Sequence, residues 1–405
     1  MAADKHLPFD EATLMSRPTA EIGQMQSRFL MFGGLGLVGL IAGYLTAGTS
    51  FWHSYLIAYI FWINITLGAL GVLMVQHLSG GKWGLVARRV LEAATRTLPV
   101  MAVLFIPIAL NLEALYSWAR PEAAADELIQ VKASYLNVNF FYVRALIYFV
   151  IWGALIYLLN KWSKEQDERP AELPGPADRR FRVLSGPGLV LYVLTVTFMS
   201  VDWVMSLDPH WYSTIFGILT IGGQGLAAMA LSILVLARLA RTAPMAQVAD
   251  ADAFHDLGKL MFAFVMLWAY FSVSQLLIIW SANLPEEIPF YLERLHGPWY
   301  PVSVLVLLGQ FALPFLLLLS QNFKRNPRTV ARIALWILIM RVVDITWTIG
   351  PVFRHEGSAL SWLDFAAVLG LGAIWTFVFF RNLGSRAVVP ARDPYLKEAL
   401  AHGGH

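Results

Sequence analysis

Long apolar runs separated by short polar stretches recur along the whole chain. A helix needs roughly 20 mainly apolar residues to cross about 30 Å of hydrocarbon, and the runs predict spans at 29–48, 53–78, 85–112, 138–160, 183–205, 212–238, 257–280, 299–321, 331–350 and 360–380. The third run is the least regular, because four charged residues crowd its start: Arg88, Arg89, Glu92 and Arg96. The pattern predicts an all-α integral membrane protein with ten transmembrane helices.

The composition agrees with a bilayer as the surrounding solvent. Apolar residues make up 58% of the chain and charged residues 14%, whereas soluble domains carry about 25% charged residues. A soluble protein must cover its surface with groups that face water, and this chain has few of them. Lipids are therefore expected partners. The net charge of +3 gives no reason to expect nucleic acid.

The positive residues alternate from loop to loop. Of the 30 Lys and Arg residues, 23 lie in loops or span ends on the side of the N-terminus. Five, including Arg144, lie in loops or span ends on the opposite side, and two, Arg96 and Arg341, lie farther inside predicted spans. Cytoplasmic loops keep the excess of Lys and Arg, so the bias places both termini in the cytoplasm. Residues 1–28 are polar and mixed in charge, which predicts an uncleaved first helix rather than a signal peptide.

Composition also divides the chain into segments. Residues 1–28 and 381–405 are predicted cytoplasmic tails, residues 29–160 hold spans one to four, and residues 183–380 hold spans five to ten. The segment 161–182 between them carries Pro170, Pro174, Pro176 and many charges, which is typical of a solvated linker.

The fifth and ninth spans share a pattern at their outer ends. Pro209 follows Asp202 by seven residues, and Pro351 follows Asp344 by seven. The match suggests that spans 2–5 and spans 6–9 form two four-helix bundles related as parallel repeats, with flanking helices. Coincidence is the alternative, since aspartate and proline are common at helix ends.

Charged residues inside spans need a partner or a task, because each costs at least roughly 2.5–3.5 kcal/mol there. Asp344 follows Arg341 by three residues, and Arg96 follows Glu92 by four. Both spacings put the two residues on one helix face, where they can pair. Glu92 and Arg96 are candidates for a structural ion pair.

Five residues are candidates for proton paths because they are predicted at different depths: His77, Glu113, Asp202, Arg341 and Asp344. Carboxylates and histidines inside a bundle can pass protons along water chains. The structural alternative is that Asp344 balances Arg341 and that His77 forms an ordinary hydrogen bond near the membrane surface. No catalytic residue is expected in this chain.

Two acidic outer segments are candidate contacts for a quinone or a partner: Asp208 with His210, and Glu286 with Glu287. Histidine can take protons from a quinol because its pKa lies near neutral. An Asp-Pro sequence at a helix end is also an ordinary cap or turn.

Redox centres are not expected in this chain. It has no cysteine, which excludes cysteine-ligated iron–sulfur clusters and a CxxCH haem attachment. His77 is the one histidine predicted deep in a span, so no axial pair for haem is apparent. We expect no metal and no bound cofactor in this chain. If the chain serves electron transfer, the electron carriers belong to other subunits.

Four runs carry a family resemblance: SVDWVMSLDPHWYSTIFG (200–217), IWSANLPEE (279–287), LPFLLLLS (313–320) and RVVD (341–344). They resemble the large membrane subunits of alternative complex III, a bacterial quinol:cytochrome c/acceptor oxidoreductase, within the NrfD/polysulfide-reductase membrane-subunit superfamily. The chain length and the Asn-Leu-Pro-Glu-Glu loop are more similar to the ActF-type subunit than to its ActC-type paralogue.

The resemblance implies a fold, a location and partners. It implies two four-helix bundles, the bacterial inner membrane, menaquinol as reductant, and partners that include an iron–sulfur subunit, haem c subunits and an ActC-like paralogue. The expected role is a non-redox subunit that supports assembly and proton translocation. Two alternatives stay open: a subunit that binds quinone itself, and an independent secondary transporter.

Overall fold

The computed structural model describes residues 11–16, 19–169, 177–355 and 358–396. In this part of the chain every regular element is a helix, and ten helices or helix series are long and apolar enough to cross a membrane. The predicted all-α, ten-span fold class is confirmed. Lys5, Arg17, Lys397 and the three prolines of the predicted linker lie outside the described residues.

Six of the ten spans are single helices: α2 (Thr19–Thr46), α3 (Thr49–Ser79), α8 (Val138–Glu168), α10 (Phe216–Leu239), α11 (Ala251–Ala282) and α17 (Trp362–Gly384). Span nine is α16 (Pro327–Ile349) with the short 3-10 turn Gly350–Val352. Span five is α9 (Arg179–Trp203) with the short 3-10 turn Met205–Leu207. Span three consists of α4 (Lys82–Thr95) and α5 (Leu98–Leu110), and span eight joins α13 (Tyr300–Leu305), the π-helix Val306–Ala312 and α14 (Leu313–Leu319). The short helices are α1 (Glu11–Leu14), α6 (Leu112–Leu115), α7 (Glu127–Val131), α12 (Pro289–Leu295) and α15 (Gln321–Arg325).

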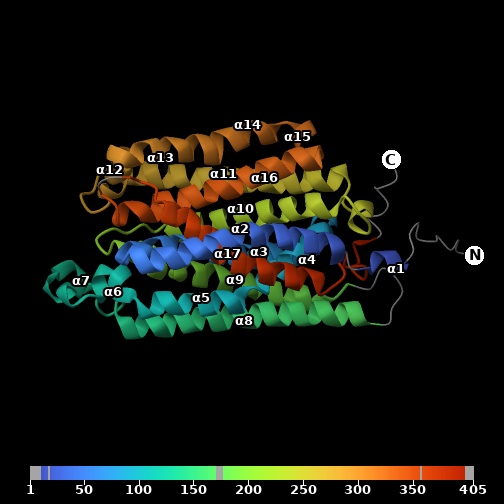
Figure 1. Cartoon of the computed structure of the whole chain (residues 1–405), viewed down its shortest axis with the longest axis horizontal. Coiled ribbons are helices and arrows are strands. Elements are labelled where there is room, and N and C mark those ends of the chain that lie inside the picture. Colours follow the sequence, from blue (N-terminus) through green and yellow to red (C-terminus); the bar gives the residue numbers. More distant parts are fainter. Residues whose placement is uncertain (1–10, 17–18, 170–176, 356–357, 397–405) are drawn as a thin grey trace, which may run out of the picture.

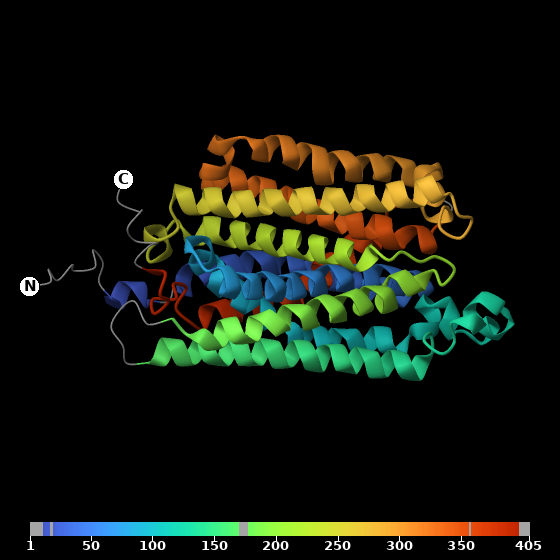
Figure 2. The same cartoon turned by 180° about the vertical axis from the view of Figure 1, so that it is seen from behind.

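The two ends of the helix bundle differ in what they carry. The end with α1, α15 and residues 385–396 is called the terminal face here, and the end with α6, α7 and α12 is called the distal face (Figure 1). Seen from behind, the teal segment 111–137 projects beyond the spans at the distal face (Figure 2). Ten crossings bring both described ends of the chain to one face. Which compartment that face meets stays a prediction.

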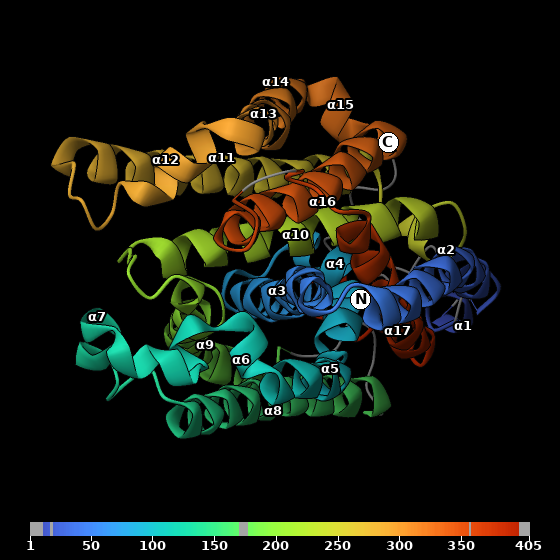
Figure 3. The same cartoon turned by 60° about the vertical axis from the view of Figure 1, so that its left-hand side comes forward.

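The spans form two groups around a central pair of helices. The oblique view shows α3 and α10 in the middle, with α5, α8 and α9 on one side and α11, α13, α14 and α16 on the other (Figure 3). The flanking helices α2 and α17 pack against each other beside α3. This is the predicted division into two four-helix bundles, called the first and second bundle below. Their relation as repeats stays a prediction.

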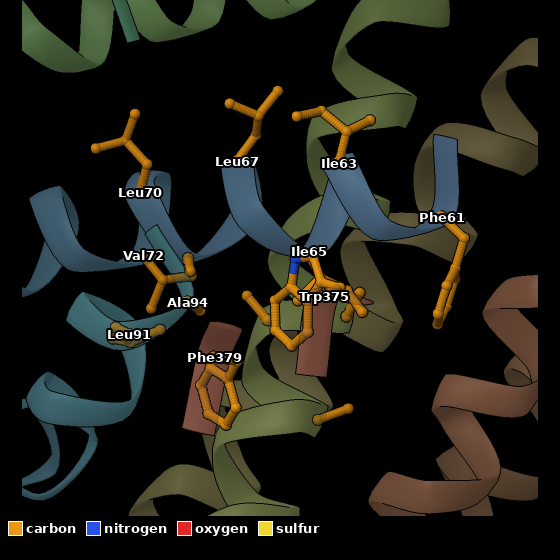
Figure 4. Close-up of a cluster of buried hydrophobic side chains, with 14 of the residues drawn as sticks. Phe61, Ile63, Ile65, Leu67, Leu70, Val72, Leu91, Ala94, Trp375 and Phe379 are labelled. Atoms are coloured by element: carbon orange, nitrogen blue, oxygen red, sulfur yellow. The ribbon is translucent and has the colours of Figure 1, made fainter. Parts of the chain in front are cut away.

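Helix α3 is apolar on all sides and is buried along most of its length, as expected for a helix in the centre of a bundle. Its side chains project in opposite directions: Ile63 and Leu67 to one side, and Ile65 toward Trp375 and Phe379 on the other (Figure 4). The helix therefore joins the first bundle to α17 as well as to α10.

Small residues let the flanking helices approach closely. A Cβ added at Gly36 of α2 would lie 2.4 Å from the backbone nitrogen of Gly370 in α17, and one at Gly33 would lie 2.3 Å from the Cβ of Ala373. In lipid, helix association depends on such close packing, so these glycines fix α2 against α17.

The irregular third span is broken at residues 96–97, where α4 ends and α5 begins. Pro99 stands in the first turn of α5, and proline favours that position because it lacks an N–H and restricts the residue before it.

Candidate functional site: a cavity beside a buried ion pair

The second bundle encloses a cavity of about 260 Å³ that runs from mid-depth toward the distal face. Its walls are mostly apolar and strongly aromatic: Phe216, Trp268, Phe290, Phe311 and Trp347. Its polar lining is small and includes Asn64, Gln275, Tyr291, Arg341 and Asp344. An apolar cavity with a few convergent polar groups is typical of a site for a small ligand.

The cavity opens on the flank of the bundle. Two of its lining side chains, Val273 of α11 and Leu307 of the π-helix, are 49% and 57% exposed. Val273 lies nine residues before the distal end of α11, which places it about 13 Å below that end at 1.5 Å per residue. The opening therefore faces the hydrocarbon layer rather than bulk water.

A buried ion pair lies at mid-depth beside the cavity. Arg341 and Asp344 are three residues apart on α16, are 4% and 7% exposed, and form a salt bridge through Nη1 and Oδ2. The predicted pairing of these two residues is confirmed. Gly223 of α10 makes room for the guanidinium, because a Cβ there would lie 2.3 Å from Arg341 Nη2.

Amide side chains connect this site to the first bundle. The Tyr192 hydroxyl donates to Gln224 Oε1 at 2.6 Å, and Gln224 Nε2 donates to Asn64 Oδ1 at 2.9 Å. The three residues belong to α9, α10 and α3, and Asn64 also lines the cavity. Sequence reasoning missed them, although amides inside apolar spans are a usable signal, since a buried polar group needs a partner.

Gln310 is a further buried amide that sequence reasoning missed. It lies in the π-helix of span eight, is fully buried, and neither amide atom has a hydrogen-bond partner among the described residues. Single π-helical turns inside α-helices occur frequently at functional sites. No periodicity in the sequence distinguishes this turn from an ordinary helix.

Asp202 lies in the interior of the first bundle, as predicted. Its Oδ2 accepts from Arg144 Nε at 2.8 Å and from the Tyr148 hydroxyl at 2.6 Å. The guanidinium of Arg144 also lies 3.9 Å from the Tyr135 ring centroid. Burial, with the Asp202 charge adding to it, raises the pKa of Tyr135 above its usual range. The sequence assigned Arg144 to the outer side of the membrane and not to this pair.

Two further candidates for proton paths, Glu113 and His77, do not line the cavity. The prediction of Glu113 in a bundle interior was wrong: α5 ends at Leu110, and Glu113 is exposed on the short helix α6 outside the spans. His77 is half-buried near the terminal face, where its ring stacks on Phe181 at 4.6 Å. Its Nε2 has no hydrogen-bond partner in the described chain.

The predicted Glu92–Arg96 ion pair was also wrong. The Arg96 backbone N–H still bonds to the Glu92 carbonyl oxygen at 3.3 Å, so the helical spacing is kept, but the Glu92 carboxylate is occupied by other partners. Arg96 instead donates to three acceptors toward the terminal face: the Glu92 and Asn382 carbonyl oxygens and the Ser385 hydroxyl.

Glu92 pairs with other residues. Its carboxylate accepts from Arg88 at 2.9 Å, from Arg89 at 2.8 Å and from Ser163 at 2.7 Å. Arg88 and Arg89 in turn bond to Asp393 and Asp167 at 2.7 and 2.5 Å. This terminal-face ion network, meaning Glu92 with these two arginines and two aspartates, ties α4 to α8 and to the C-terminal segment.

The outer acidic residues do not form one site. His210 Nε2 lies 2.9 Å from Asp126 Oδ2, and the His210 backbone N–H donates to Asp208 at 3.1 Å. Glu286 is exposed and Glu287 half-buried in the loop after α11. The cavity of the second bundle is lined by none of these four residues: Asp208, His210, Glu286 and Glu287.

Arg294 of α12 covers the distal end of the cavity region. It is buried and donates to the carbonyl oxygens of Phe290, Trp347 and Thr348 at 2.6, 3.1 and 2.6 Å. Burial lowers the pKa of Arg294 to about 9. These bonds attach α12 to the last turn of α16, where the free carbonyl groups favour a cation.

Comparison with known proteins leaves the family unassigned. Neither a scan against protein-family models nor a search of curated proteins found a match for this chain. Among the described residues, no group of three or more His, Asp or Glu side chains is placed to hold a metal ion.

Proposed function

We propose that the chain is a non-redox membrane subunit of a bacterial quinol:cytochrome c/acceptor oxidoreductase of the alternative complex III type, similar to its ActF subunit. Its terminal face lies in the cytoplasm and its spans cross the inner membrane. Menaquinol is oxidised elsewhere in the complex, and haem c and iron–sulfur clusters belong to partner subunits, which include an ActC-like paralogue. The chain supports assembly and takes part in proton translocation.

The observation that carries this proposal is the Arg341–Asp344 pair at mid-depth, facing a cavity. Two apolar residues would have a lower free energy at this depth, so ionisable residues there indicate a function. Asp344 can take up and release a proton, while Arg341 stabilises the ionised carboxylate.

Buried polar groups lie at several levels between this pair and the terminal face. Asn64 lines the cavity and accepts from Gln224 of α10. On the opposite side of α3, Thr66 hydrogen-bonds to Thr97 at 2.8 Å. Beyond Thr97, a further hydrogen bond of 3.2 Å joins Asn160 to Thr95, one turn from Glu92. These hydroxyl, amide and carboxylate groups are the kind that water needs in order to bridge a proton path.

The test is Asp344→Asn in the assembled complex, with Asp256→Asn on the exposed side of α11 as the matched control. We expect assembly, quinol oxidation in uncoupled vesicles, and fewer protons moved per electron in sealed vesicles. Loss of assembly would favour a purely structural pair, and an unchanged proton-to-electron ratio would remove Asp344 from any path.

The proposed orientation has its own test. Single cysteines at Lys164 and Glu286, both exposed, are expected to react from opposite sides of oriented vesicles. The cysteine-free chain makes the labelling unambiguous. Reaction of both positions from one side would contradict the topology.

The cavity favours a second candidate function, quinone binding by this chain. Its aromatic walls suit a flat ring, and its opening at the level of the hydrocarbon admits a ligand from the lipid. Val273→Trp would obstruct the opening. Reduced binding of a menaquinone analogue to the purified variant would favour this candidate, whereas the proton-path function expects no change in quinol oxidation.

A further inference from the structure

A second, polar pocket of about 430 Å³ lies at the terminal face, between the ends of α8 and α17 and the segment 385–392. It is separate from the cavity of the second bundle and shares no lining residue with it. Its lining contains four cations and two carboxylates: Arg96, Lys164, Arg386, Arg392, Asp167 and Glu168. The lining therefore has an excess of positive charge.

Both carboxylates already have cationic partners. Asp167 bonds to Arg89 at 2.5 Å, and Glu168 lies 3.6 Å from Lys164. Arg89 is not part of the pocket lining, so Asp167 is paired with a cation from outside the lining. The guanidinium groups of Arg386 and Arg392 are left as the main electrostatic feature.

Several guanidinium donors in this pocket lack an acceptor. Arg392 Nε and Nη1 and Arg386 Nη1 are buried and have no hydrogen-bond partner among the described residues. The nearest acid to Arg386, Glu92, is 3.7 Å away and shared with Arg88 and Arg89. Buried donors are usually satisfied in folded proteins, so two arginines of the lining have donor capacity that the described residues do not use.

We propose that this pocket binds the phosphodiester headgroup of an anionic phospholipid from the leaflet at the terminal face. A phosphate presents several acceptor oxygens and is bound well by the planar fork of arginine. This proposal goes beyond the proposed function and does not depend on it.

The depth of the pocket favours a lipid over a soluble anion. Arg96 stands at the break within span three and reaches the end of α17, where its Nη2 donates to Asn382 at 2.6 Å. The pocket thus lies at the ends of the spans, which is the level of lipid headgroups, and basic pockets between helices there recognise anionic lipids. A bound lipid would hold the segment 385–392 against α8.

The test uses the full chain, delipidated in detergent, with lipid binding measured by native mass spectrometry. We expect phosphatidylglycerol to bind more tightly than phosphatidylcholine. Arg392→Gln should weaken phosphatidylglycerol binding about tenfold, the effect of losing one hydrogen bond to a charged group. The Arg392 side chain makes no hydrogen bond in the described chain, so the fold should be unaffected. Arg381→Gln, on the exposed side of α17, is the matched control and should change binding less than about twofold.

Three results would overturn the proposal. The first is equal phosphatidylglycerol affinity in Arg392→Gln and Arg381→Gln. The second is equal affinity for phosphatidylglycerol and phosphatidylcholine in the unmodified chain. The third is displacement of phosphatidylglycerol by an equal concentration of inorganic phosphate, which would identify a soluble anion as the ligand. Should Arg392→Gln lower the melting temperature, Arg392→Lys is the second variant. It keeps the charge, and the proposal expects it to bind more tightly than Arg392→Gln.

Discussion

Charged residues are buried in several regions of this membrane protein, and two of these regions differ in their surroundings. At the terminal face, Glu92 lies among arginines that bond in turn to Asp167 and Asp393. In the second bundle, Arg341 and Asp344 form one pair beside a cavity. The first arrangement connects three parts of the chain, and the second lies on one helix. Burial of a charge therefore does not by itself indicate function. A buried charge with several partners and no adjacent cavity indicates a structural network. A single ion pair beside a cavity is a candidate site.

The largest effect is expected for Glu92→Ala. The change leaves Arg88 and Arg89 buried with one carboxylate each, and removing one partner of a buried pair costs about 3–5 kcal/mol. We expect loss of the folded chain from membranes, or a strongly lowered melting temperature in detergent.

The control for Glu92→Ala is Glu168→Gln, whose partner Lys164 is exposed. Exposed pairs contribute about 0–1 kcal/mol, so this variant should behave like the unmodified chain. Equal stability of both variants would mean that the ion network is not structural.

A smaller effect is expected when the pair in the second bundle is removed as a unit. Replacing a buried ion pair by apolar residues of similar volume is often neutral or stabilising. The double variant Arg341→Met, Asp344→Leu should therefore fold with a melting temperature close to that of the unmodified chain, while proton translocation by the complex is lost. A double variant as unstable as Glu92→Ala would mean that the Arg341–Asp344 pair is as important for folding as the terminal-face ion network, and would contradict a functional role that is separate from stability.

Gly223→Ala tests how firmly Arg341 is held. The added Cβ would lie 2.3 Å from Arg341 Nη2, and overpacking in a core costs about 1–3 kcal/mol. The matched control is Gly186→Ala in α9, where no atom lies within 4 Å of the new Cβ. Thermal melting in detergent should show destabilisation for Gly223→Ala and none for Gly186→Ala. Equal melting temperatures would mean that Arg341 has room to move.

The smallest effect concerns the exposed acid Asp126 on the distal face. The backbone N–H of Ile129 lowers the pKa of Asp126, and His210 adds to this effect. A lowered pKa in the folded state means that the ionised form stabilises helix α7 above the ordinary aspartate pKa, and that this contribution is lost as the pH falls through the lowered value. Hydrogen exchange at Leu128 and Ile129 should therefore speed up at acidic pH beyond its intrinsic dependence. Asp126→Asn should remove this pH dependence, and its persistence would assign it to another group.

The sequence alone determined the fold class. Ten apolar runs predicted ten spans, and all ten are helices or helix series in the described chain, because membrane crossing requires a local and continuous pattern. The pairing of Arg341 with Asp344 was predictable for the same reason, since three residues on one helix fix the distance.

The tertiary structure decided the rest. Glu92 and Arg96 satisfied the same kind of spacing rule, but Glu92 pairs with Arg88 and Arg89, and Arg96 reaches the end of α17 instead. Long-range partners could not be predicted either: Arg88 bonds to Asp393, 305 residues away, and Gln224 bonds to Asn64, 160 residues away. The cavity beside Asp344 and the polar pocket at Arg392 depend on how several helices pack together. Spacing along one helix constrains neighbours within a turn or two, whereas contacts between helices depend on packing that no local pattern specifies.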